Sequence, residues 1–297
     1  MRKINGDYAT GYLNKILYFP QCLIDSFNGD KRNLVIKKIW LKPIKETYTY
    51  GSPSRRLCNM FLNSINWKYL SNKFKNDLRF FDIGCGNGKY GKFFKKISGD
   101  CFHSYAGLDI YKDNSFPVEF NHYLDKAENI SNYLSNINCI VSISALEHIE
   151  YDEQVLYEIT KYFNREDKPF IQIHLIPARA SLFLYLWHGW RQYSKNNLGK
   201  ISEILKSHYA VDVVVIPLGG LKSFIRHFIH ITIPSLISFF TKKSISYEWD
   251  DPESKVSKFI ERAVLKELET NDLIPTFWGL IISSKSIDID SLFTKKV

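Results

Sequence analysis

The stretch FDIGCGNGKYG, residues 81–91, decides the fold of this 297-residue chain. An apolar run over residues 78–83 stops at a cluster of glycines, and a helical pattern of lysine and aromatic residues begins at Lys89. This order predicts a strand, a glycine turn and a helix. Glycine has no Cβ and tolerates positive φ, so a ligand can lie against the bare backbone of such a turn. The glycines concerned are Gly84, Gly86 and Gly88.

Two classes of adenosine-containing cofactor use a turn of this kind. Residues 86–91 match GxGxxG, the dinucleotide pattern in which a pyrophosphate caps the helix N-terminus. The longer pattern adds Asp82 and becomes acid-x-Gly-x-Gly-x-Gly. A carboxylate attracts a sulfonium and an ammonium but repels two phosphates. The charge of Asp82 therefore favours S-adenosylmethionine over a dinucleotide.

The longer pattern resembles the first motif of class I S-adenosylmethionine-dependent methyltransferases of the small-molecule type. Three further motifs follow in the order that this resemblance requires. Asp109 ends an apolar strand at the distance where both cofactor classes place an acid for the ribose hydroxyls. DKAENI, residues 125–130, is similar to a segment whose aspartate meets the adenine amino group. ALEHI, residues 145–149, supplies the Glu-His pair that opens the helix after the fourth strand.

The resemblance implies a Rossmann-like α/β fold. Its mostly parallel seven-stranded sheet would carry helices on both faces and one antiparallel strand near the end. The cofactor would be S-adenosylmethionine, released as S-adenosylhomocysteine. The residues implied to bind it are Asp82, Gly84, Cys85, Gly86, Gly88, Asp109, Ile110, Asp125, Lys126, Ala127 and Ser144.

The apolar pattern along the chain predicts the same alternation of strands and helices. Expected strands cover residues 78–83, 104–109, 117–122, 138–143 and 169–175, and by resemblance 211–218 and 276–284 form the last pair. Expected helices cover residues 89–97, 126–135 and 150–163.

The chain is expected to consist of a methyltransferase domain, residues 77–297, and an N-terminal extension of helix and loop, residues 1–76. Within the extension, Ser52 and Pro53 have the residue types of a helix start. The domain departs from a minimal one at a substrate-side segment, residues 176–200, and at an insertion, residues 219–275.

The insertion contains an apolar stretch with basic flanks, residues 221–243. Arg226, His227 and His230 interrupt it, so it is expected to be too short and too polar to span a bilayer. A lid or buried helix is favoured over a helix lying on a membrane surface, because exposed apolar patches are uncommon on soluble proteins. Peripheral membrane contact through this stretch stays the alternative.

The segment after the fifth strand is dense in aromatic and polar residues. By resemblance it faces the methyl group, and ligands of open α/β sheets bind outside the carboxyl ends of the strands. Its candidates for binding a sugar or phosphate are Trp187, Trp190, Arg191 and Tyr193. The alternative is that the aromatics pack against the sheet and that Arg191 satisfies a helix end. A looser similarity links this segment to methyltransferases of bacterial surface-polysaccharide clusters.

Methyl transfer from a sulfonium is an in-line displacement that needs positioning more than a nucleophile. A hydroxyl acceptor would profit from a general base, for which His188 and His148 are the candidates, although in the resembling family the latter more often orients its helix. The chain has neither the proline-rich loop of base and amide methylation nor aspartates for Mg²⁺ at this strand end. We therefore expect no metal and an oxygen acceptor in a small molecule, a sugar or a lipid-linked intermediate.

Composition indicates a reduced, cytoplasmic protein. Its five cysteines are scattered and form no CxxC pair, which argues against disulfides and zinc. No secretory leader pattern is visible at the N-terminus. The net charge of +9 is spread along the chain, without the basic runs and interleaved aromatics of nucleic-acid binders. Nucleic acid is therefore not an expected partner, and the oligomeric state is left open.

Two other classes of function remain open at this stage. An NAD(P)-dependent oxidoreductase is compatible with GxGxxG and Asp109 but is opposed by Asp82 and the two later motifs. A non-catalytic protein could keep the fold and dock on a membrane or partner through residues 221–243.

Overall fold

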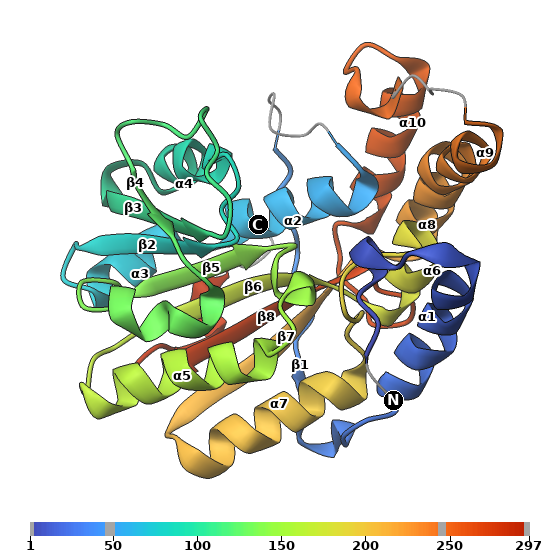
Figure 1. Ribbon diagram of the computed structural model, residues 1–297. Coiled ribbons are helices and arrows are strands. Elements are labelled where there is room, and N and C mark those ends of the chain that lie inside the picture. The colour runs from blue at the N-terminus through green and yellow to red at the C-terminus, as the bar shows by residue number, and fades with distance from the viewer. Residues whose placement is uncertain (1–2, 45–50, 243–247, 294–297) are drawn as a thin grey trace.

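A central β-sheet lies between two layers of helices in the computed structural model of the chain (Figure 1). The structure describes residues 3–44, 51–242 and 248–293. The sheet has eight strands in the order β1-β7-β8-β6-β5-β2-β3-β4. They are β1 (Val35–Ile36), β2 (Leu78–Ile83), β3 (Phe102–Asp109), β4 (Asn121–Leu124), β5 (Cys139–Ile143), β6 (Ile171–Pro177), β7 (Val211–Leu218) and β8 (Phe277–Ser284).

The sheet topology confirms the expected fold class. β8 runs antiparallel to both β6 and β7, and the other pairs are parallel. The seven expected strands are joined by an eighth, because Val35 and Ile36 pair with Val214 and Val215 at the edge. Two residues are too short for a period-2 pattern, so the sequence could not indicate this strand.

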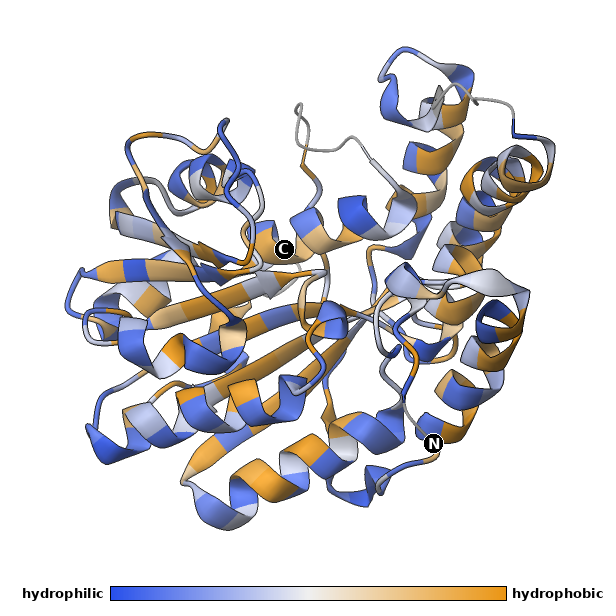
Figure 2. Cartoon of the chain, viewed as in Figure 1, coloured by the Kyte–Doolittle hydropathy of each residue, from blue (hydrophilic) through white to orange (hydrophobic). Residues whose placement is uncertain are grey.

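Helices cover both faces of the sheet, and each face has its own main cluster of buried hydrophobic residues. One face packs against α2 (Pro53–Ser64), α3 (Trp67–Lys73), α4 (Lys89–Ser98) and α10 (Lys255–Val264). The other packs against α5 (Asp152–Arg165), α7 (Lys195–His208) and the 3₁₀ helix η5 (Ala127–Tyr133). Figure 2 shows the result as hydrophobic strands and helices that are hydrophobic on one side. Strands buried on both faces explain the near-continuous apolar runs of the sequence.

Most predicted elements agree with the structure within two residues, and two differ more. The strand expected at 117–122 lies at Asn121–Leu124, because Phe116 and Pro117 instead pack over the glycine turn. The helix expected at 126–135 is the 3₁₀ helix η5. Asp125 accepts hydrogen bonds there from Lys126 N (2.7 Å) and Asn129 Nδ2 (2.7 Å), which holds a tight turn.

The predicted N-terminal extension shares its core with the rest of the domain. Leu57 and Phe61 of α2 belong to the same hydrophobic cluster as β2 and β8. Helix α1 (Gly11–Asp25) packs through Tyr18 and Cys22 against Leu182 of the short helix α6 (Leu182–Tyr185). Residues 1–2 and 45–50 of the extension lie outside the described residues.

The insertion forms a long exposed helix. α8 (Leu221–His227), a π-helical turn (Phe228–Thr232) and α9 (Ile233–Thr241) are continuous. Among the described residues this is the one helix long and apolar enough to cross a membrane, with 21 residues and a window only 11% buried. The expectation that the stretch is too short and too polar is therefore wrong, and so is that of a buried helix. Residues 243–247 of the insertion lie outside the described residues.

Candidate functional site

The glycine turn follows β2 and depends on positive φ angles. These are +70° at Gly84, +52° at Gly86 and +68° at Gly88. A Cβ at Gly84 would lie 2.5 Å from Ala145 Cβ, and one at Gly88 would lie 2.6 Å from the Phe116 ring. A Cβ at Gly86 would meet no atom within 4 Å. The first and third glycines thus allow close packing, while the second faces open space.

Asp82 is a buried carboxylate at the end of β2. Its Oδ2 accepts a hydrogen bond from Tyr105 OH (2.7 Å), while its Oδ1 has no hydrogen-bond partner. Burial raises the pKa of Asp82 to about 7, although the Tyr105 hydrogen bond acts in the opposite direction. An orphaned buried oxygen beside the turn suits a cationic ligand.

Asp109 links the end of β3 to the glycine turn. Its Oδ2 accepts from Gly86 N (2.8 Å) and its Oδ1 from Tyr111 N (3.1 Å). Because β2 and β3 are parallel neighbours, Asp82 and Asp109 reach the same edge of the sheet. The exposed Ile110 follows directly.

The remaining predicted cofactor residues lie around this edge. Cys85 is buried against Gly107, and a Cβ at Gly107 would lie 2.5 Å from Cys85 Sγ. Asp125 precedes η5 and also accepts a hydrogen bond from Tyr133 OH (2.9 Å), with Lys126 exposed and Ala127 buried beside it. Ser144 has a φ of +58° directly after β5, an unfavourable angle for a residue with a Cβ. The role of all these residues in cofactor binding stays a prediction.

The two predicted catalytic histidines lie together at the carboxyl ends of β5 and β6. His148 ends a 3₁₀ turn, η6 (Leu146–His148), and its ring centroid lies 4.5 Å from that of His188 in an edge-to-face arrangement. Asp7 joins them: its Oδ2 accepts from His148 Nδ1 (2.7 Å), and its Oδ1 lies 3.6 Å from His188 Nδ1. Burial disfavours the charged imidazole, yet the Asp7 hydrogen bond and the Glu147 charge raise the pKa of His148.

Glu147 completes this cluster. The side chain is fully buried, and neither carboxylate oxygen has a hydrogen-bond partner. Its Oε1 lies 3.5 Å from His188 Nε2 and 4.0 Å from His148 Nε2. We refer to Asp7, Glu147, His148 and His188 as the two-histidine cluster.

The predicted substrate-binding residues have other contacts. Trp187 donates from Nε1 to Lys15 O (3.0 Å) and packs against Phe239, so it joins α1 to α9. Arg191 is buried and pairs with Asp152 (3.4 Å), while Tyr193 OH donates to the same carboxylate. These internal contacts favour the alternative that the three residues pack within the domain, and their role in substrate binding stays a prediction. Trp190 is half-buried and its backbone N donates to Glu147 O (2.7 Å), which leaves its predicted role untested.

His174 does not reach the site. It is fully buried within β6, where its ring nitrogens bond to Ser142 Oγ (2.8 Å) and Gln172 Oε1 (3.1 Å). Burial lowers the pKa of His174 to about 3, so the ring is neutral at ordinary pH. His174 lies inside a strand, whereas His148 and His188 follow strands, and this explains why His174 alone is buried away from the two-histidine cluster.

Two residues of the site come from the N-terminal extension and were not predicted. Asp7 reaches the cluster because Gly6 N donates to Gly189 O (2.7 Å), which lays this segment against the loop before α7. Arg55 of α2 donates from Nη1 to Tyr90 OH (3.0 Å) of α4, and its charge lowers the pKa of Asp82 against the larger effect of burial. Neither residue stands in a recognisable motif, and only tertiary structure brings it here.

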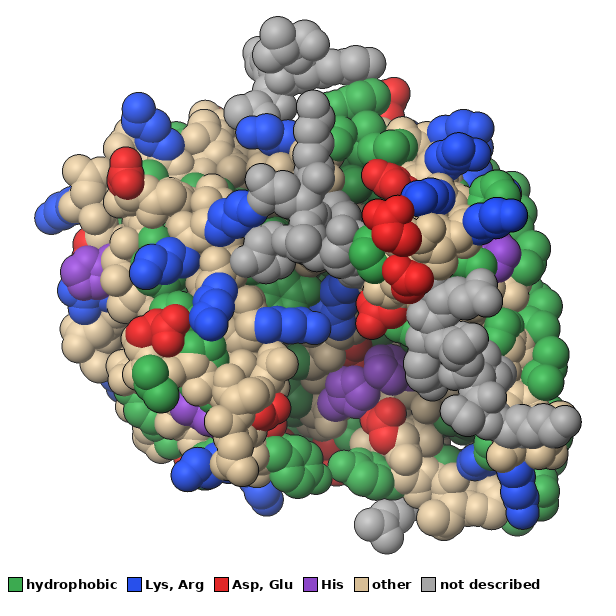
Figure 3. Space-filling view, turned by 90° about the horizontal axis from the view of Figure 1, so that it is seen from above, with side chains coloured by type: hydrophobic (Ala, Val, Ile, Leu, Met, Phe, Trp, Pro, Cys, Tyr) green, Lys and Arg blue, Asp and Glu red, His purple; other side chains and the backbone are tan. Residues whose placement is uncertain are grey.

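The surface of the molecule is hollowed where histidine side chains gather. Figure 3 shows histidine side chains at the rim of a central hollow, with acidic side chains beside them and lysine and arginine side chains across it. Such a hollow offers room for a ligand between the glycine turn and the two-histidine cluster.

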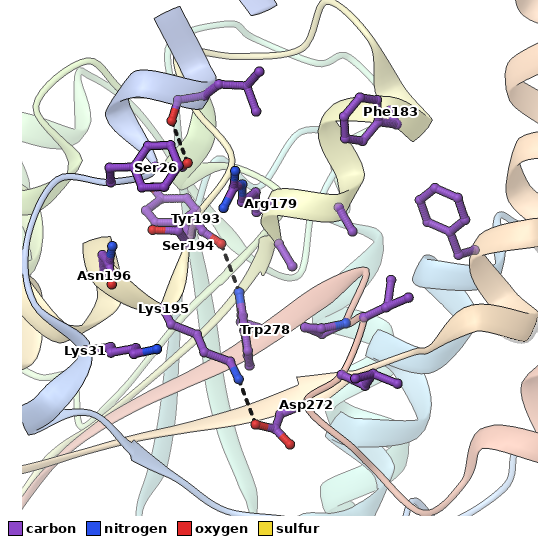
Figure 4. A pocket seen from close by; sticks show the side chains of 18 of the residues that line it. Ser26, Lys31, Arg179, Phe183, Tyr193, Ser194, Lys195, Asn196, Asp272 and Trp278 are labelled. Atoms are coloured by element: carbon purple, nitrogen blue, oxygen red, sulfur yellow. Dashed lines mark hydrogen bonds and ion pairs between the residues drawn. The ribbon is translucent and has the colours of Figure 1, made fainter. Parts of the chain in front are cut away.

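A separate pocket of about 700 Å³ lies between α1, α6 and the start of α7 (Figure 4). Tyr193 and Trp278 form part of its wall, and the Lys195–Asp272 ion pair (2.7 Å) lies at one side. No predicted cofactor residue lines it. This pocket is therefore distinct from the site at the glycine turn.

Comparison with known proteins gives structural similarity without sequence relatives. No protein-family model and no curated protein matches the sequence. Among solved structures, the chain is similar to S-adenosylmethionine-dependent methyltransferases. The plantazolicin methyltransferase BamL, solved with a triazolic desmethylPZN analog and S-adenosylhomocysteine, is 15% identical over 75% of this chain and 85% of its own, with a TM-score of 0.47.

Other similar structures include different chemistry. A methyltransferase from Archaeoglobus fulgidus is 17% identical over 76% of this chain and 94% of its own, with a TM-score of 0.44. The [4+2]-cyclase SpnF is 10% identical over 90% of this chain and 94% of its own, with a TM-score of 0.43. Likeness at this level does not identify a reaction, so function is argued from the site.

Proposed function

We propose that this protein is an S-adenosylmethionine-dependent methyltransferase. The observation that carries the proposal is the glycine turn with its two acids. Gly86 faces open space, Asp109 is fixed to the backbone of the turn, and Asp82 keeps one buried oxygen without a partner. The carboxylates favour a ligand with positive charge and hydroxyl groups over a pyrophosphate.

Each residue has a distinct part in holding this cofactor. Asp109 would accept hydrogen bonds from the ribose hydroxyls, since each of its oxygens has a lone pair beyond the backbone bonds. Asp82 would attract the cationic end of the cofactor. Arg55, whose guanidinium donates a hydrogen bond to Tyr90 OH, would pair with the carboxylate of the cofactor. When bound, S-adenosylmethionine supplies an activated methyl group.

We propose that the acceptor atom is an oxygen of a small molecule, a sugar or a lipid-linked intermediate. The two-histidine cluster supports this assignment, because it gathers imidazoles and carboxylates where an acceptor would meet the methyl group. Such groups can accept the proton of a hydroxyl group or weaken its O–H bond through a hydrogen bond. His148 and His188 would thus activate the acceptor.

Transfer of a labelled methyl group tests the proposal. The protein would be incubated with methyl-labelled S-adenosylmethionine and a panel of sugars, phenols and polyprenyl-linked glycans. We expect label in an ether that resists mild base, and inhibition by S-adenosylhomocysteine. Label confined to amines would contradict oxygen transfer, and NADH oxidation with a carbonyl substrate would support the oxidoreductase instead.

The exposed helix supports a place at the membrane surface. Ile237 (54% exposed) and Phe240 (72% exposed) of α9 present apolar side chains to solvent, as does the outer side of α1. Hydrophobic side chains line the right-hand edge of the molecule in Figure 3, where α1 and α9 lie in Figure 1. Thr232 Oγ1 donates to Leu184 O (2.7 Å), so one side of the helix is bound to the domain. Because lipid cannot surround it, the helix would lie on a bilayer rather than cross it.

A further inference from the structure

The two-histidine cluster has the composition of a metal centre. Asp7, His148 and His188 each offer a ligand atom, and these atoms lie within 4.8 Å of one another. Imidazole nitrogen with carboxylate oxygen is the donor set of many divalent transition metals. The fully buried Glu147 carboxylate adds a fourth group at the same place.

Asp7 determines which ring nitrogens are available. Its two oxygens face the Nδ1 atoms of both histidines, at 2.7 Å from His148 and 3.6 Å from His188. The hydrogen bond to Asp7 fixes the proton of His148 on Nδ1 and leaves its lone pair on Nε2. At His188, which lies beyond hydrogen-bond length, the charge of Asp7 favours the same tautomer. Metal-binding histidines are oriented by carboxylates in the same way.

Glu147 faces the two free nitrogens without a hydrogen bond of its own. Its Oε1 lies 3.5 Å from His188 Nε2 and 4.0 Å from His148 Nε2, beyond hydrogen-bond length. A buried carboxylate without a partner is costly. Atoms bound to one metal ion at about 2.0–2.2 Å are separated by about 3–4 Å. The spacing in the cluster agrees with this separation.

The backbone around the cluster holds these groups in place. Trp190 N donates to Glu147 O (2.7 Å), and Gly189 N donates to Asp7 Oδ2 (3.0 Å). A Cβ at Gly189 would lie 2.4 Å from Glu147 O, so only glycine fits the contact between the two loops. His148 and His188 are therefore presented by segments that are fixed to each other.

We propose that the two-histidine cluster binds a divalent transition metal through His148 Nε2, His188 Nε2 and the Glu147 carboxylate, with Asp7 as the positioning residue. The two nitrogen ligands favour Zn²⁺ or Fe²⁺ over Mg²⁺ and Ca²⁺, which prefer oxygen, and the Glu147 carboxylate also allows the weaker binding of Mn²⁺. The sequence-based expectation of no metal considered aspartates at the strand end and pairs of cysteines, whereas here the ligands come from two loops.

A metal at this place would alter how the acceptor is activated. Three protein ligands leave a coordination position open, and a hydroxyl bound there loses its proton more readily. The histidines would then act as ligands rather than as bases. This role rests on the proposed methyl transfer, but metal binding itself does not.

Metal titration of the chelator-treated protein tests the proposal. Calorimetry with Zn²⁺ and electron paramagnetic resonance with Mn²⁺ should each show about one site per chain. His148→Ala, His188→Ala and Glu147→Gln should abolish this site, and Asp7→Asn should weaken it by about 10–100-fold. His103→Ala is the matched control, because His103 also faces an aspartate (Asp77, 3.3 Å) but lies on the surface.

Two outcomes would overturn the proposal. One is that neither Zn²⁺ nor Mn²⁺ binds. The other is that Glu147→Gln binds metal as tightly as wild type while its circular dichroism shows a native fold. Titration with S-adenosylhomocysteine separates this proposal from the proposed function. Metal binding without S-adenosylhomocysteine binding would refute the methyltransferase and leave the metal site standing.

Discussion

Of the three glycines in the turn, Gly86 is the one at which the backbone leaves most room for a ligand. Its φ of +52° and the open space at its Cβ position are shared by Gly99, which ends α4 far from the turn in the sequence. Alanine at Gly86 should cost about 1–2 kcal/mol through its positive φ, and alanine at Gly99 should cost at least as much, because the ψ of −131° there lies outside the left-handed helical region. Only Gly86→Ala fills the proposed cofactor space.

The pair Gly86→Ala and Gly99→Ala therefore separates strain from ligand contact. We expect a loss of stability in urea unfolding in both variants, at least as large in Gly99→Ala, but a loss of S-adenosylhomocysteine affinity of at least about tenfold only in Gly86→Ala. Calorimetric titration of both variants measures the difference. Equal affinities in the two variants would place the ligand elsewhere.

Asp82 should make stability depend on pH. Burial raises its pKa to about 7 in the folded protein, against about 3.9 for an unfolded aspartate. Between these values the folded state holds a proton that the unfolded state has lost, so this group's contribution to stability falls as pH rises from about 4 to about 7. The amide of an asparagine at this position cannot titrate.

Asp82→Asn should accordingly gain stability relative to wild type over that interval, by up to about 4 kcal/mol, and the gain should level off above pH 7. Its side-chain oxygen can still accept the Tyr105 hydrogen bond. Urea unfolding of both proteins at pH 5, 6 and 8 measures the effect. A difference that does not change with pH would contradict the raised pKa.

At the residue scale, local motifs indicated the glycine turn but not the whole site. The positions of Gly84, Gly86 and Gly88 follow from a turn whose positive φ angles favour glycine. Asp7 and Arg55 reach the site through contacts with Gly189 and Tyr90, which are distant in the chain. A single sequence carries no pattern for such contacts.

At the scale of elements, the loop between β6 and α7 is held by a buried ion pair. Arg191 lies between Asp152 and Glu153 of α5, at 3.4 and 3.2 Å. Removal of one partner of a buried pair leaves an uncompensated charge and typically costs about 3–5 kcal/mol. Arg191→Ala should lower the free energy of unfolding by about this amount, as measured by urea unfolding.

A second variant distinguishes packing from substrate binding. Arg191→Met combined with Asp152→Asn removes both charges and should recover most of the lost stability. Affinity for S-adenosylhomocysteine should be unchanged in the double variant. A normal unfolding free energy in Arg191→Ala would instead favour the role in substrate binding that the sequence suggested.

Apolar periodicity predicted the long elements well and failed on short ones. The strands that form the buried centre of the sheet have continuous apolar runs, so their bounds agree closely with the structure. η5 was expected as an α-helix because its apolar residues fit either spacing over so short a segment. The helix α8–α9 was expected to be a lid or a buried helix, and it is not buried, since composition does not show which side of a helix is covered. Its role as a lid stays a prediction.

At the scale of the whole molecule, the apolar side formed by α1 and α9 predicts binding to lipid. The positive net charge favours an anionic surface. Ile237→Ser combined with Phe240→Ser should abolish most co-sedimentation with phosphatidylserine vesicles. Val118→Ser is the matched control, because Val118 is fully exposed on the loop before β4. Equal sedimentation of the double variant and wild type would contradict a membrane role.

The same topology that orders the sheet also assembles the site. β2, β3, β5 and β6 are parallel and adjacent, so the acids of the glycine turn and the two-histidine cluster meet at one edge. The alternation of elements predicted this edge, while the N-terminal extension, expected to be peripheral, supplies Asp7 and Arg55 to it.

Calorimetric titration with S-adenosylhomocysteine and NADH side by side tests the central claim most directly. The Asp82 carboxylate should attract the ammonium group of the first ligand and repel the pyrophosphate of the second, while Asp109 suits the ribose of either. We predict binding of S-adenosylhomocysteine that Asp109→Ala weakens by about 1–3 kcal/mol. Binding of NADH without S-adenosylhomocysteine would contradict the account.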